Sequence, residues 1–493
     1  MTAVSQKNNF YLFTIILISF LLRVLFLGNH DLIVEEAYYW NYAAHMDLGY
    51  IDHPPMVAVL IKLSTAIFGT NEFGVRCPAM LCWLITAYYS YRWCELIQIG
   101  TGRFAVLLLS ILPFFYLYSI MITPDLPMMA CWSAVLYYLY RAIHLNHKHA
   151  WYAAGIALGL GLFSKYSIAL LAVTTGLFLI GTPALRFWFG RKEPYLAAII
   201  ALLLFSPVIY WNATHDWASF AFQSTHRLTG NFQFSLHQLV GILILFLTPI
   251  GLIGFGKLLK PSFRLPIDPL ITRFLRFYAL VPLLVFATFS LTRVIKFNWI
   301  GPSLLALLPW LGLLLHHQIT KLRHWLQLSP VLIVLPTALF FCVSYGQPAY
   351  LNQLFLSKMV DWGQFTRDFY QIASKATLPG KPPVFIALDT YSIPSELAFY
   401  QTKQSRANPK LPIYPIYGAD MFGFNSLMYK LWNDADLKGK TIVLIGKERY
   451  SFQNELVSNA TVPMSAVTQV WGKSQGQLAN VRPYYYQIVR MVE

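Results

Sequence analysis

Acidic residues and histidines recur in the stretch VEEAYYWNYAAHMDLGYIDHPPM, which covers residues 34–56. Glu35 and Glu36 are adjacent, a cluster of aromatic residues follows them, and an Asp-His-Pro-Pro step occupies residues 52–55. A carboxylate can take the proton of a reacting hydroxyl group, and a cation can stabilise the charge that develops on a leaving phosphate. Aromatic rings offer an apolar face to a sugar and favour the membrane interface. The stretch therefore contains the residue types of a group-transfer site.

The composition surrounding this stretch is that of a membrane protein. Of 493 residues, 57% are hydrophobic and 12% are charged, and the mean hydropathy is +0.51. Apolar runs near the length needed to cross a bilayer recur along the chain. The net charge of +16 does not indicate nucleic-acid binding, because the basic residues are spread between the apolar runs. We predict a polytopic α-helical membrane protein with no nucleic-acid partner.

The sequence predicts two domains, residues 1–346 in the membrane and residues 347–493 in a soluble domain. Eleven of the 21 acidic residues precede residue 347, and ten follow it in a part less than half as long. The second part contains the strand-like runs PVFIALD (383–389) and TIVLIGK (441–447), with a helical pattern between them. This order predicts a small α/β domain, and no glycine-rich loop indicates a nucleotide.

We predict about eleven transmembrane helices in the first domain. The segment 55–69 is apolar but short and is interrupted by Lys62, so we interpret it as an interfacial or re-entrant helix. The expected spans are 10–28, 73–94, 104–122, 125–142, 150–164, 166–183, 195–211, 237–256, 274–292, 298–316 and 327–346.

The loops between these spans differ in basic residues. If the chain crosses the membrane at each of the eleven expected spans, fifteen Lys and Arg residues lie on one side and six on the other. The side richer in basic residues marks the cytoplasm. The N-terminus is then cytoplasmic, whereas the loop 29–72 and the C-terminal domain are extracytoplasmic.

The same topology brings rare ionisable residues of the membrane domain to the external face. These are Asp125, Lys165, Arg293 and Lys296. Each has a structural interpretation: Asp125 after a proline could cap a helix, and Lys165 could extend its amine to the interface. Their convergence on one face nevertheless favours a functional site, because ionisable groups at membrane depth are costly. Carboxylates and cations at a bilayer surface suit the transfer of a group from a lipid phosphate.

The opening stretch resembles the first external loop of the bacterial membrane enzymes of glycosyltransferase family 39. These enzymes have the GT-C fold and are related to protein O-mannosyltransferases and to the lipid A aminoarabinose transferase. Their loop carries a DE-x-x-Y element and a later [DE]-[HK]-P-P step, which read here as EEAYY (35–39) and DHPP (52–55). Further matching pieces follow in order: TPDLP (123–127), FSKYS (163–167), HDWASFAFQSTHR (215–227), KFNWIGP (296–302) and SELAFY (395–400).

The resemblance implies roles for the acidic residues. Glu35 would be the acid nearest the acceptor, and Asp125 would be a second acid that shapes the site. The family's usual first acid is Asp, and Glu extends about one methylene further, while catalytic groups tolerate only small misplacements. Glu36 is therefore the alternative base.

The resemblance also implies a phosphate site and a sugar pocket. The residues expected near the donor phosphate are His53, where relatives carry Lys, together with Lys165, Arg293 and Lys296. The residues expected near the substrate are Tyr39, Asp52 and Tyr38, with packing of the loop the favoured role for Tyr38. No cofactor is assigned: no residues have the spacing of metal ligands, although an oxygen-rich site can hold a divalent ion.

The function implied is inverting transfer of a sugar from a polyprenyl-phosphate donor at the outer face of the bacterial cytoplasmic membrane. A glycolipid such as lipid A is the favoured acceptor, ahead of protein. The alternative is a transporter or flippase of lipid-linked sugars, which predicts an internal repeat that the sequence lacks. A non-catalytic assembly protein would leave the converging carboxylates unexplained.

The asymmetry of the loops makes a direct prediction about topology. A reporter fused after Gln353 should be active only as an extracytoplasmic fusion, because the basic residues place the N-terminus in the cytoplasm. Paired alkaline phosphatase and fluorescent protein fusions measure this. A cytoplasmic signal would mean that the number of spans is wrong by one and that the proposed site is divided between two faces.

Overall fold

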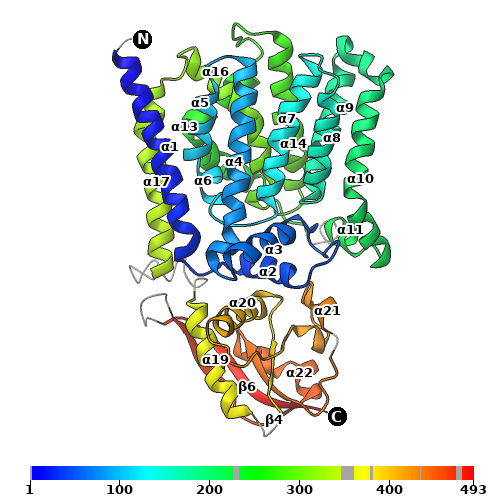
Figure 1. Cartoon of the computed structure of the whole chain (residues 1–493). Coiled ribbons are helices and arrows are strands. Elements are labelled where there is room, and N and C mark those ends of the chain that lie inside the picture. The colour runs from blue at the N-terminus through cyan, green and yellow to red at the C-terminus, as the bar shows by residue number, and fades with distance from the viewer. Residues whose placement is uncertain are drawn as a thin grey trace. The chain divides into compact units, whose positions relative to one another are not determined.

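The chain folds into two compact units (Figure 1). The computed structural model describes residues 3–225, 232–345, 360–377, 381–433, 435–473 and 480–492. Unit 1 comprises Met1–Leu27, Leu48–Val57 and Arg76–Pro336. Unit 2 comprises Gly28–Asp47, Ala58–Val75 and Thr337–Glu493. Much of the loop expected at residues 29–72 therefore packs with the C-terminal part of the chain.

Unit 1 is helical, and a helix occupies each range expected to span the membrane. The helices are α1 (Ala3–Asn29), α4 (Glu72–Ile97), α5 (Gly102–Ile111), α6 (Pro113–Tyr118), α7 (Asp125–Ile143), α8 (Ala150–Leu162), α9 (Ala169–Gly181), α10 (Lys192–Thr214), α11 (Ala218–Gln223), α13 (Leu236–Leu259), α14 (Pro269–Ser290), α15 (Phe297–Ile300), α16 (Leu308–His316) and α17 (Leu322–Tyr345). Several are shorter than expected. The range 104–122, for example, is divided between α5 and α6 at Pro113, whose nitrogen carries no hydrogen to donate.

Five helical segments of the described residues are long and apolar enough to cross a membrane. A sixth is obtained if α9 with its preceding turn and the 3₁₀ helix η2 (Pro183–Gly190), which are bent by 118°, are counted as one span. The chain is therefore an integral membrane protein, while the count of eleven spans stays a prediction. Helix α3 (Met56–Phe68) has 13 residues, too few to span a bilayer.

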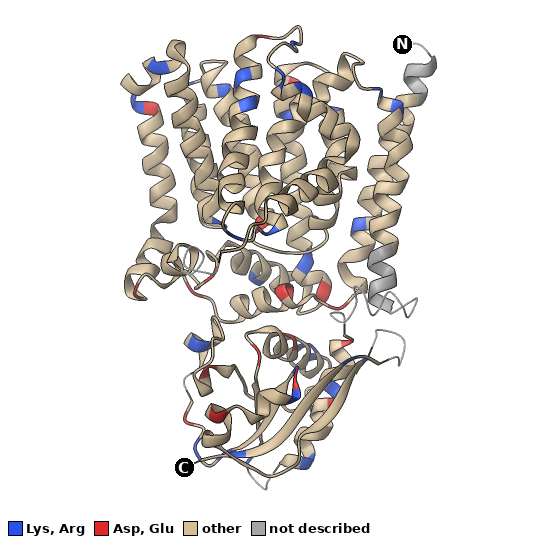
Figure 2. Cartoon of the chain, turned by 180° about the vertical axis from the view of Figure 1, so that it is seen from behind, with Lys and Arg blue, Asp and Glu red and all other residues tan. Residues whose placement is uncertain are grey.

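Basic residues of unit 1 are concentrated near the end at which α1 begins (Figure 2). This distribution agrees with the asymmetry counted along the sequence. The side of the membrane on which that end lies stays a prediction.

Close packing of α8 against its neighbours fixes the helix ends that carry the candidate site. At Gly155 and Gly159 an added Cβ would collide with Ala197 and Ala201 of α10. Small residues let helix backbones approach closely, which is a common way to hold helices together in membranes. Helix α7 also packs along α8. As a result, the start of α7 and the end of α8 are held in fixed positions.

Unit 2 contains an α/β fold, with a mixed sheet of six strands among the described residues. The strands are β1 (Val384–Ala387), β2 (Ile416–Tyr417), β3 (Thr441–Gly446), β4 (Thr461–Pro463), β5 (Thr468–Lys473) and β6 (Asn480–Met491). Their order is β2-β1-β3-β6-β4, with β5 also paired to β6. Strand β1 is parallel to β2 and β3, whereas β6 is antiparallel to β3, β4 and β5. The predicted strand runs at 383–389 and 441–447 are β1 and β3.

Helices of unit 2 lie between the strands in sequence or precede them. These include α19 (Trp362–Ala376), α20 (Ser392–Ala407) and α22 (Glu455–Ala460). The hydrophobic core beside the sheet includes Ile386 of β1, Leu444 of β3 and Val489 of β6. Buried on both faces, β1 and β3 have the continuous apolar sequences that such strands require.

Helix α2 (Val34–Ala44), which carries Glu35, packs against α20 within unit 2. The backbone N–H of Leu32 donates to the Tyr400 hydroxyl at 2.8 Å, and Asn41 Nδ2 donates to the Ser395 carbonyl at 3.2 Å. Both acceptors lie in the motif SELAFY. The matching motif at residues 395–400 thus holds the helix that bears the candidate base.

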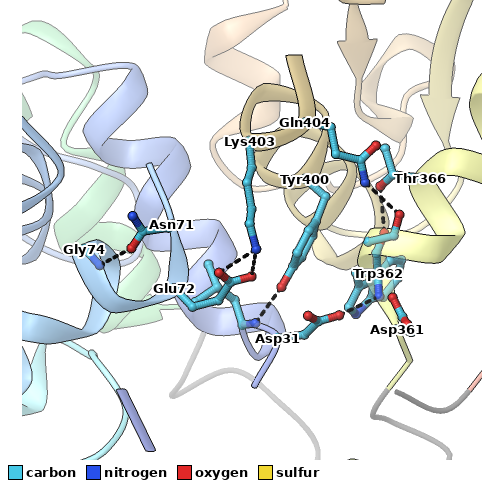
Figure 3. Close-up of polar contacts among 12 residues, drawn as sticks. Asp31, Asn71, Glu72, Gly74, Asp361, Trp362, Thr366, Tyr400, Lys403 and Gln404 are labelled. Atoms are coloured by element: carbon cyan, nitrogen blue, oxygen red, sulfur yellow. Dashed lines mark hydrogen bonds and ion pairs between the residues drawn. The ribbon is translucent and has the colours of Figure 1, made fainter. Parts of the chain in front are cut away.

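Polar contacts within unit 2 hold the segment before α2 and the start of α4 (Figure 3). Lys403 Nζ contacts the Glu72 carboxylate at 2.6 Å, and the Trp362 N–H donates to Asp31 Oδ2 at 2.9 Å. Burial raises the pKa of Asp31 to about 6, and the nearby Asp361 and Glu72 carboxylates contribute to the rise. The Lys403 amine and the Trp362 hydrogen bond oppose it only in part. The pKa of Asp31 therefore lies near 6.

The raised pKa of Asp31 predicts how stability depends on pH. The folded state favours the protonated carboxyl, so this contribution is complete below pH 3.8 and is lost as pH rises through about 6. Asp31→Asn keeps an oxygen to accept the Trp362 hydrogen bond but cannot ionise. We expect this variant to match wild type near pH 4.5 and to be more stable by about 1–3 kcal/mol at pH 7.5. Thermal unfolding of purified protein across this range measures the difference, and parallel curves would contradict the prediction.

Candidate functional site

A buried carboxylate anchors the polar cluster of unit 1. Asp125 is the first residue of α7 and is 2% exposed. Its Oδ1 accepts a charged hydrogen bond from Lys165 Nζ at 2.6 Å, and its Oδ2 accepts from Asn298 Nδ2 at 2.9 Å. The carboxylate thus bridges two distant segments of the chain, which a helix cap alone would not do. Lys165 is also buried, so both charged groups of the pair are shielded from solvent.

The backbone around Lys165 breaks between two helices. Helix α8 ends at Leu162, and Lys165 has an extended conformation before the 3₁₀ turn η1 (Tyr166–Ile168). Ser164 Oγ donates to the Pro124 carbonyl at 2.8 Å, so a neutral hydrogen bond joins the two loops in addition to the ion pair. These contacts bring FSKYS and TPDLP together, as the resemblance implies.

Lys165 lines a cavity of about 760 Å³. Its polar lining includes His53, Tyr166, Ser167 and Gln223. Its apolar lining comes mainly from α14 and comprises Val281, Leu284, Val285, Phe286 and Phe289, with Leu177 of α9 and Trp299. The cavity is therefore amphiphilic, and its size lies within the usual range for ligand pockets. A ligand with a polar head and an apolar tail would complement such a lining.

The other residues expected at the phosphate occupy different positions. Arg293 and Lys296 are not among the described residues that line the cavity, although Thr292 and Trp299 line it close by in sequence. Lys296 is exposed at the start of α15, and the Arg293 carbonyl accepts from Ser235 Oγ at 2.6 Å. Asp52 is buried, and its carbonyl accepts from Gln223 Nε2. The structure therefore brings together His53 and Lys165 but not the four cations.

Glu35 and Glu36 differ sharply within unit 2. The Glu35 side chain is exposed on the first turn of α2. Glu36 is fully buried, and its Oε2 accepts a hydrogen bond from the Ile33 N–H at 3.1 Å. A Glu at the third helical position that reaches back in this way stabilises the start of a helix. Glu36 thus has a structural contact, whereas the Glu35 side chain is exposed.

The two tyrosines after these acids are buried in an aromatic cluster. Tyr38 lies 4.6 Å from Tyr391 between ring centroids, and its hydroxyl accepts from the Met428 N–H at 3.4 Å. Tyr39 contacts Tyr42 at 5.6 Å between centroids. Packing accounts for the contacts of Tyr38, in keeping with the favoured role for this position.

Sequence reasoning missed Asn298 and Gln223 as individual site residues. Both lie inside matching motifs, KFNWIGP and HDWASFAFQSTHR. The motifs indicated the segments that form the site but not which of their residues contribute to it. At Gly301 of the first motif, three residues after Asn298, a side chain would overlap the Phe114 ring, which explains the glycine at this position. His226 and Arg227, the last residues of the second motif, lie outside the described residues.

The described residues contain no group of three or more His, Cys, Asp or Glu side chains placed to hold a metal ion. The cluster around Asp125 instead contains one carboxylate, one amine and one amide. These groups can bind and orient polar ligands by hydrogen bonds and charge.

The fold is shared with a solved membrane-protein structure. The chain superposes on the crystal structure of ArnT from Cupriavidus metallidurans with a TM-score of 0.64, over 99% of this chain and 98% of that one, at 15% identity. A second structure of that protein, bound to undecaprenyl phosphate, gives the same values.

The sequence comparisons cover part of the chain. Residues 52–211 match the family model described as dolichyl-phosphate-mannose-protein mannosyltransferase. The lipid A galacturonosyltransferase RgtD of Rhizobium johnstonii is 25% identical over 192 residues, which are 38% of this chain and 39% of RgtD. The match thus spans about two fifths of that curated relative. These comparisons confirm the resemblance drawn from the motifs: the chain is similar to the mannosyltransferase family model over residues 52–211, to RgtD in part of its sequence and to ArnT in its fold.

The buried pair predicts a large and reciprocal effect on stability. Asp125→Asn leaves the Lys165 amine buried without its counter-ion, and Lys165→Met leaves the carboxylate buried without its cation. Each should lower the free energy of unfolding by about 3–5 kcal/mol, whereas the double variant should recover much of the loss. Thermal or chemical unfolding in detergent measures all three. Lys296→Met, at an exposed lysine, is the control and should change stability by less than about 1 kcal/mol; equal small effects at both lysines would contradict the prediction.

Proposed function

We propose that the protein transfers a sugar from a polyprenyl-phosphate donor to an envelope acceptor at the outer face of the bacterial cytoplasmic membrane. The observation that carries the proposal is the amphiphilic cavity of unit 1, which has His53 and Lys165 among its polar residues and α14 along its apolar wall. A prenyl chain matches the apolar wall, and a phosphate matches the cationic groups. Undecaprenyl phosphate bound to ArnT supports a donor of this class.

In the proposed reaction, an acceptor hydroxyl oxygen attacks the anomeric carbon of the donor sugar. The bond from that carbon to the phosphate oxygen breaks, its electron pair stays with the leaving polyprenyl phosphate, and the configuration at carbon inverts. Glu35 takes the proton of the acceptor hydroxyl. The negative charge of the leaving phosphate is stabilised by Lys165, assisted by His53. No metal ion is needed to balance this step.

The Asp125–Lys165 pair gives Lys165 a defined position before the donor binds. A lysine on a flexible stem otherwise loses side-chain entropy when it is immobilised by a ligand. Asp125, itself held by Asn298, orients the amine near the cavity. Asp125 therefore shapes the phosphate site through Lys165, and Arg293 and Lys296 remain candidates for contacts with the rest of the donor.

A lipid A-type glycolipid is the favoured acceptor, ahead of protein. The galacturonosyltransferase relative acts on lipid A by its name, and ArnT shares the fold over nearly the whole chain. We propose residues 1–346 as the transmembrane catalytic domain and residues 347–493 as an extracytoplasmic domain, with a cytoplasmic N-terminus. A flippase has no support among these relatives. Sugar transfer by purified protein without an ion gradient separates the two functions.

Glu35 and Glu36 provide a matched pair of variants to test the base. Glu35→Gln should lower the rate of transfer by about 10²–10⁴, because the amide cannot accept a proton at neutral pH. Glu36→Gln keeps an oxygen that can accept from the Ile33 N–H, so its rate should stay within about threefold of wild type. The measurement is transfer from radiolabelled undecaprenyl-phosphate-linked sugars to purified lipid A. Loss of activity in Glu36→Gln with retention in Glu35→Gln would reassign the base to Glu36.

A further inference from the structure

Another cavity of unit 1, of about 530 Å³, lies where the loop after α7 leads into α8. It shares no lining residue with the cavity at Lys165. Arg141 follows Asp125 by 16 residues in α7, so the helix separates this cavity from the ion pair by about 24 Å at 1.5 Å per residue. The polar residues that line it are Tyr138, Arg141, Asn146, His147, Lys148 and His149.

The polar lining consists of groups that can donate hydrogen bonds, and no carboxylate is among the described residues that line the cavity. The ion pairs of the described residues include neither Arg141 nor Lys148. Lys148 is exposed and Arg141 is partly exposed, so both cations can reach a ligand. Asp268 acts electrostatically on Tyr140 and His144, but neither of these lines the cavity. The lining therefore has positive charge that an anion would complement.

The positions of these cations are set by the surrounding chain. Arg141 Cζ lies 5.6 Å from the centroid of the Tyr137 ring, a contact that does not use the N–H donors of the guanidinium. Asn146 has a φ of 52°, in the left-handed region that Asn adopts more readily than most residues. The turn that follows is closed by the His147 N–H, which donates to the Arg141 carbonyl at 3.1 Å. Arg141 and Lys148 thus line one cavity before any ligand binds.

The packing of α8 on α10 places this cavity at the level where a candidate membrane span begins. Residues 155 and 159 of α8 meet residues 197 and 201 of α10, so the two helices run parallel and in step. The start of α8 is then level with the start of α10, which is long and apolar enough to cross a membrane. Helix α10 begins at the same end of unit 1 as α1 (Figure 1), where basic residues are concentrated. Basic groups at the start of a span lie among the lipid headgroups.

We infer that this cavity binds the headgroup phosphate of an anionic glycerophospholipid. Arg141 and Lys148 supply the positive charge, and a guanidinium can present two N–H groups to two phosphate oxygens. A lipid is the source of the phosphate, rather than free phosphate, because the cavity lies at the level of the headgroups. A lipid with a net negative charge is preferred over a zwitterionic one, whose ammonium group the same cations repel. The inference does not depend on the proposed reaction.

Two lysines provide a matched pair of variants. Lys148 lines the cavity, whereas Lys192 begins α10 at the same level and does not line it. Both are exposed, so Lys148→Gln and Lys192→Gln remove the same charge at the same depth. Binding in the cavity predicts an effect at Lys148 alone, whereas a general attraction between the basic surface and anionic lipids predicts equal effects. Arg141→Gln tests the second cation.

The test is binding of phosphatidylglycerol, phosphatidylethanolamine and inorganic phosphate, each alone, to delipidated full-length protein in a neutral detergent, measured by native mass spectrometry. Wild type should bind phosphatidylglycerol at least about fivefold more tightly than phosphatidylethanolamine. Lys148→Gln and Arg141→Gln should each weaken the binding of phosphatidylglycerol by about three- to tenfold, because each removes a direct contact. Lys192→Gln should stay within about twofold of wild type, because distant exposed charges are screened at physiological salt.

Equal losses of affinity in Lys148→Gln and Lys192→Gln would overturn the inference, and so would equal binding of the two lipids by wild type. If inorganic phosphate displaces phosphatidylglycerol and its own binding is lost in Lys148→Gln, the cavity is a site for free anions and the assignment to a lipid is wrong. Thermal unfolding checks that each variant is folded. If Arg141→Gln does not fold, the two variants at exposed lysines decide.

Discussion

A carboxylate buried in an apolar helical unit needs a compensating cation, and the Asp125–Lys165 pair satisfies this constraint in unit 1. The pair joins the start of α7 to the break after α8, and Asn298 joins the segment before α16 to the same carboxylate. Three segments far apart in sequence therefore depend on one charged group. Replacing such a pair by apolar residues is often tolerated, whereas removing one member is costly. This constraint explains why the motifs TPDLP, FSKYS and KFNWIGP meet at Asp125.

The ion pair also determines how the Lys165 amine would meet a phosphate. A free lysine at the membrane edge would attract anions from any direction. Lys165 is instead neutralised by Asp125 and directed by it, so a donor phosphate would meet an oriented amine that already has a partner. Selectivity would then depend on the cavity, with its apolar wall along α14, as much as on charge. An amphiphilic lining of this kind favours a lipid phosphate over a free one.

Within unit 2, the C-terminal part of the chain supports the helix α2 and the segment before it. The helix that bears Glu35 packs on α20, and the backbone before it is held by Tyr400. Glu36 completes this support from within the helix. The C-terminal part of the chain thus orders a loop that the sequence places more than 300 residues earlier. Functional loops are usually positioned by a rigid scaffold, and α20 is such a scaffold for the helix that bears the proposed base.

The sequence by itself determined the membrane character, the positions of the helices, the strands β1 and β3, and the family resemblance. These features depend on local runs of apolar residues and on short motifs, both of which can be read along the chain. The tertiary structure decided what depends on distant neighbours: that Glu36 is buried and Glu35 exposed, that Asn298 shares Asp125 with Lys165, and that Arg293 and Lys296 do not line the cavity. Adjacent glutamates are equivalent in a sequence pattern, and only packing distinguishes them. The cavity at Lys165 likewise has no sequence signature, because empty space is a property of how side chains from several helices meet.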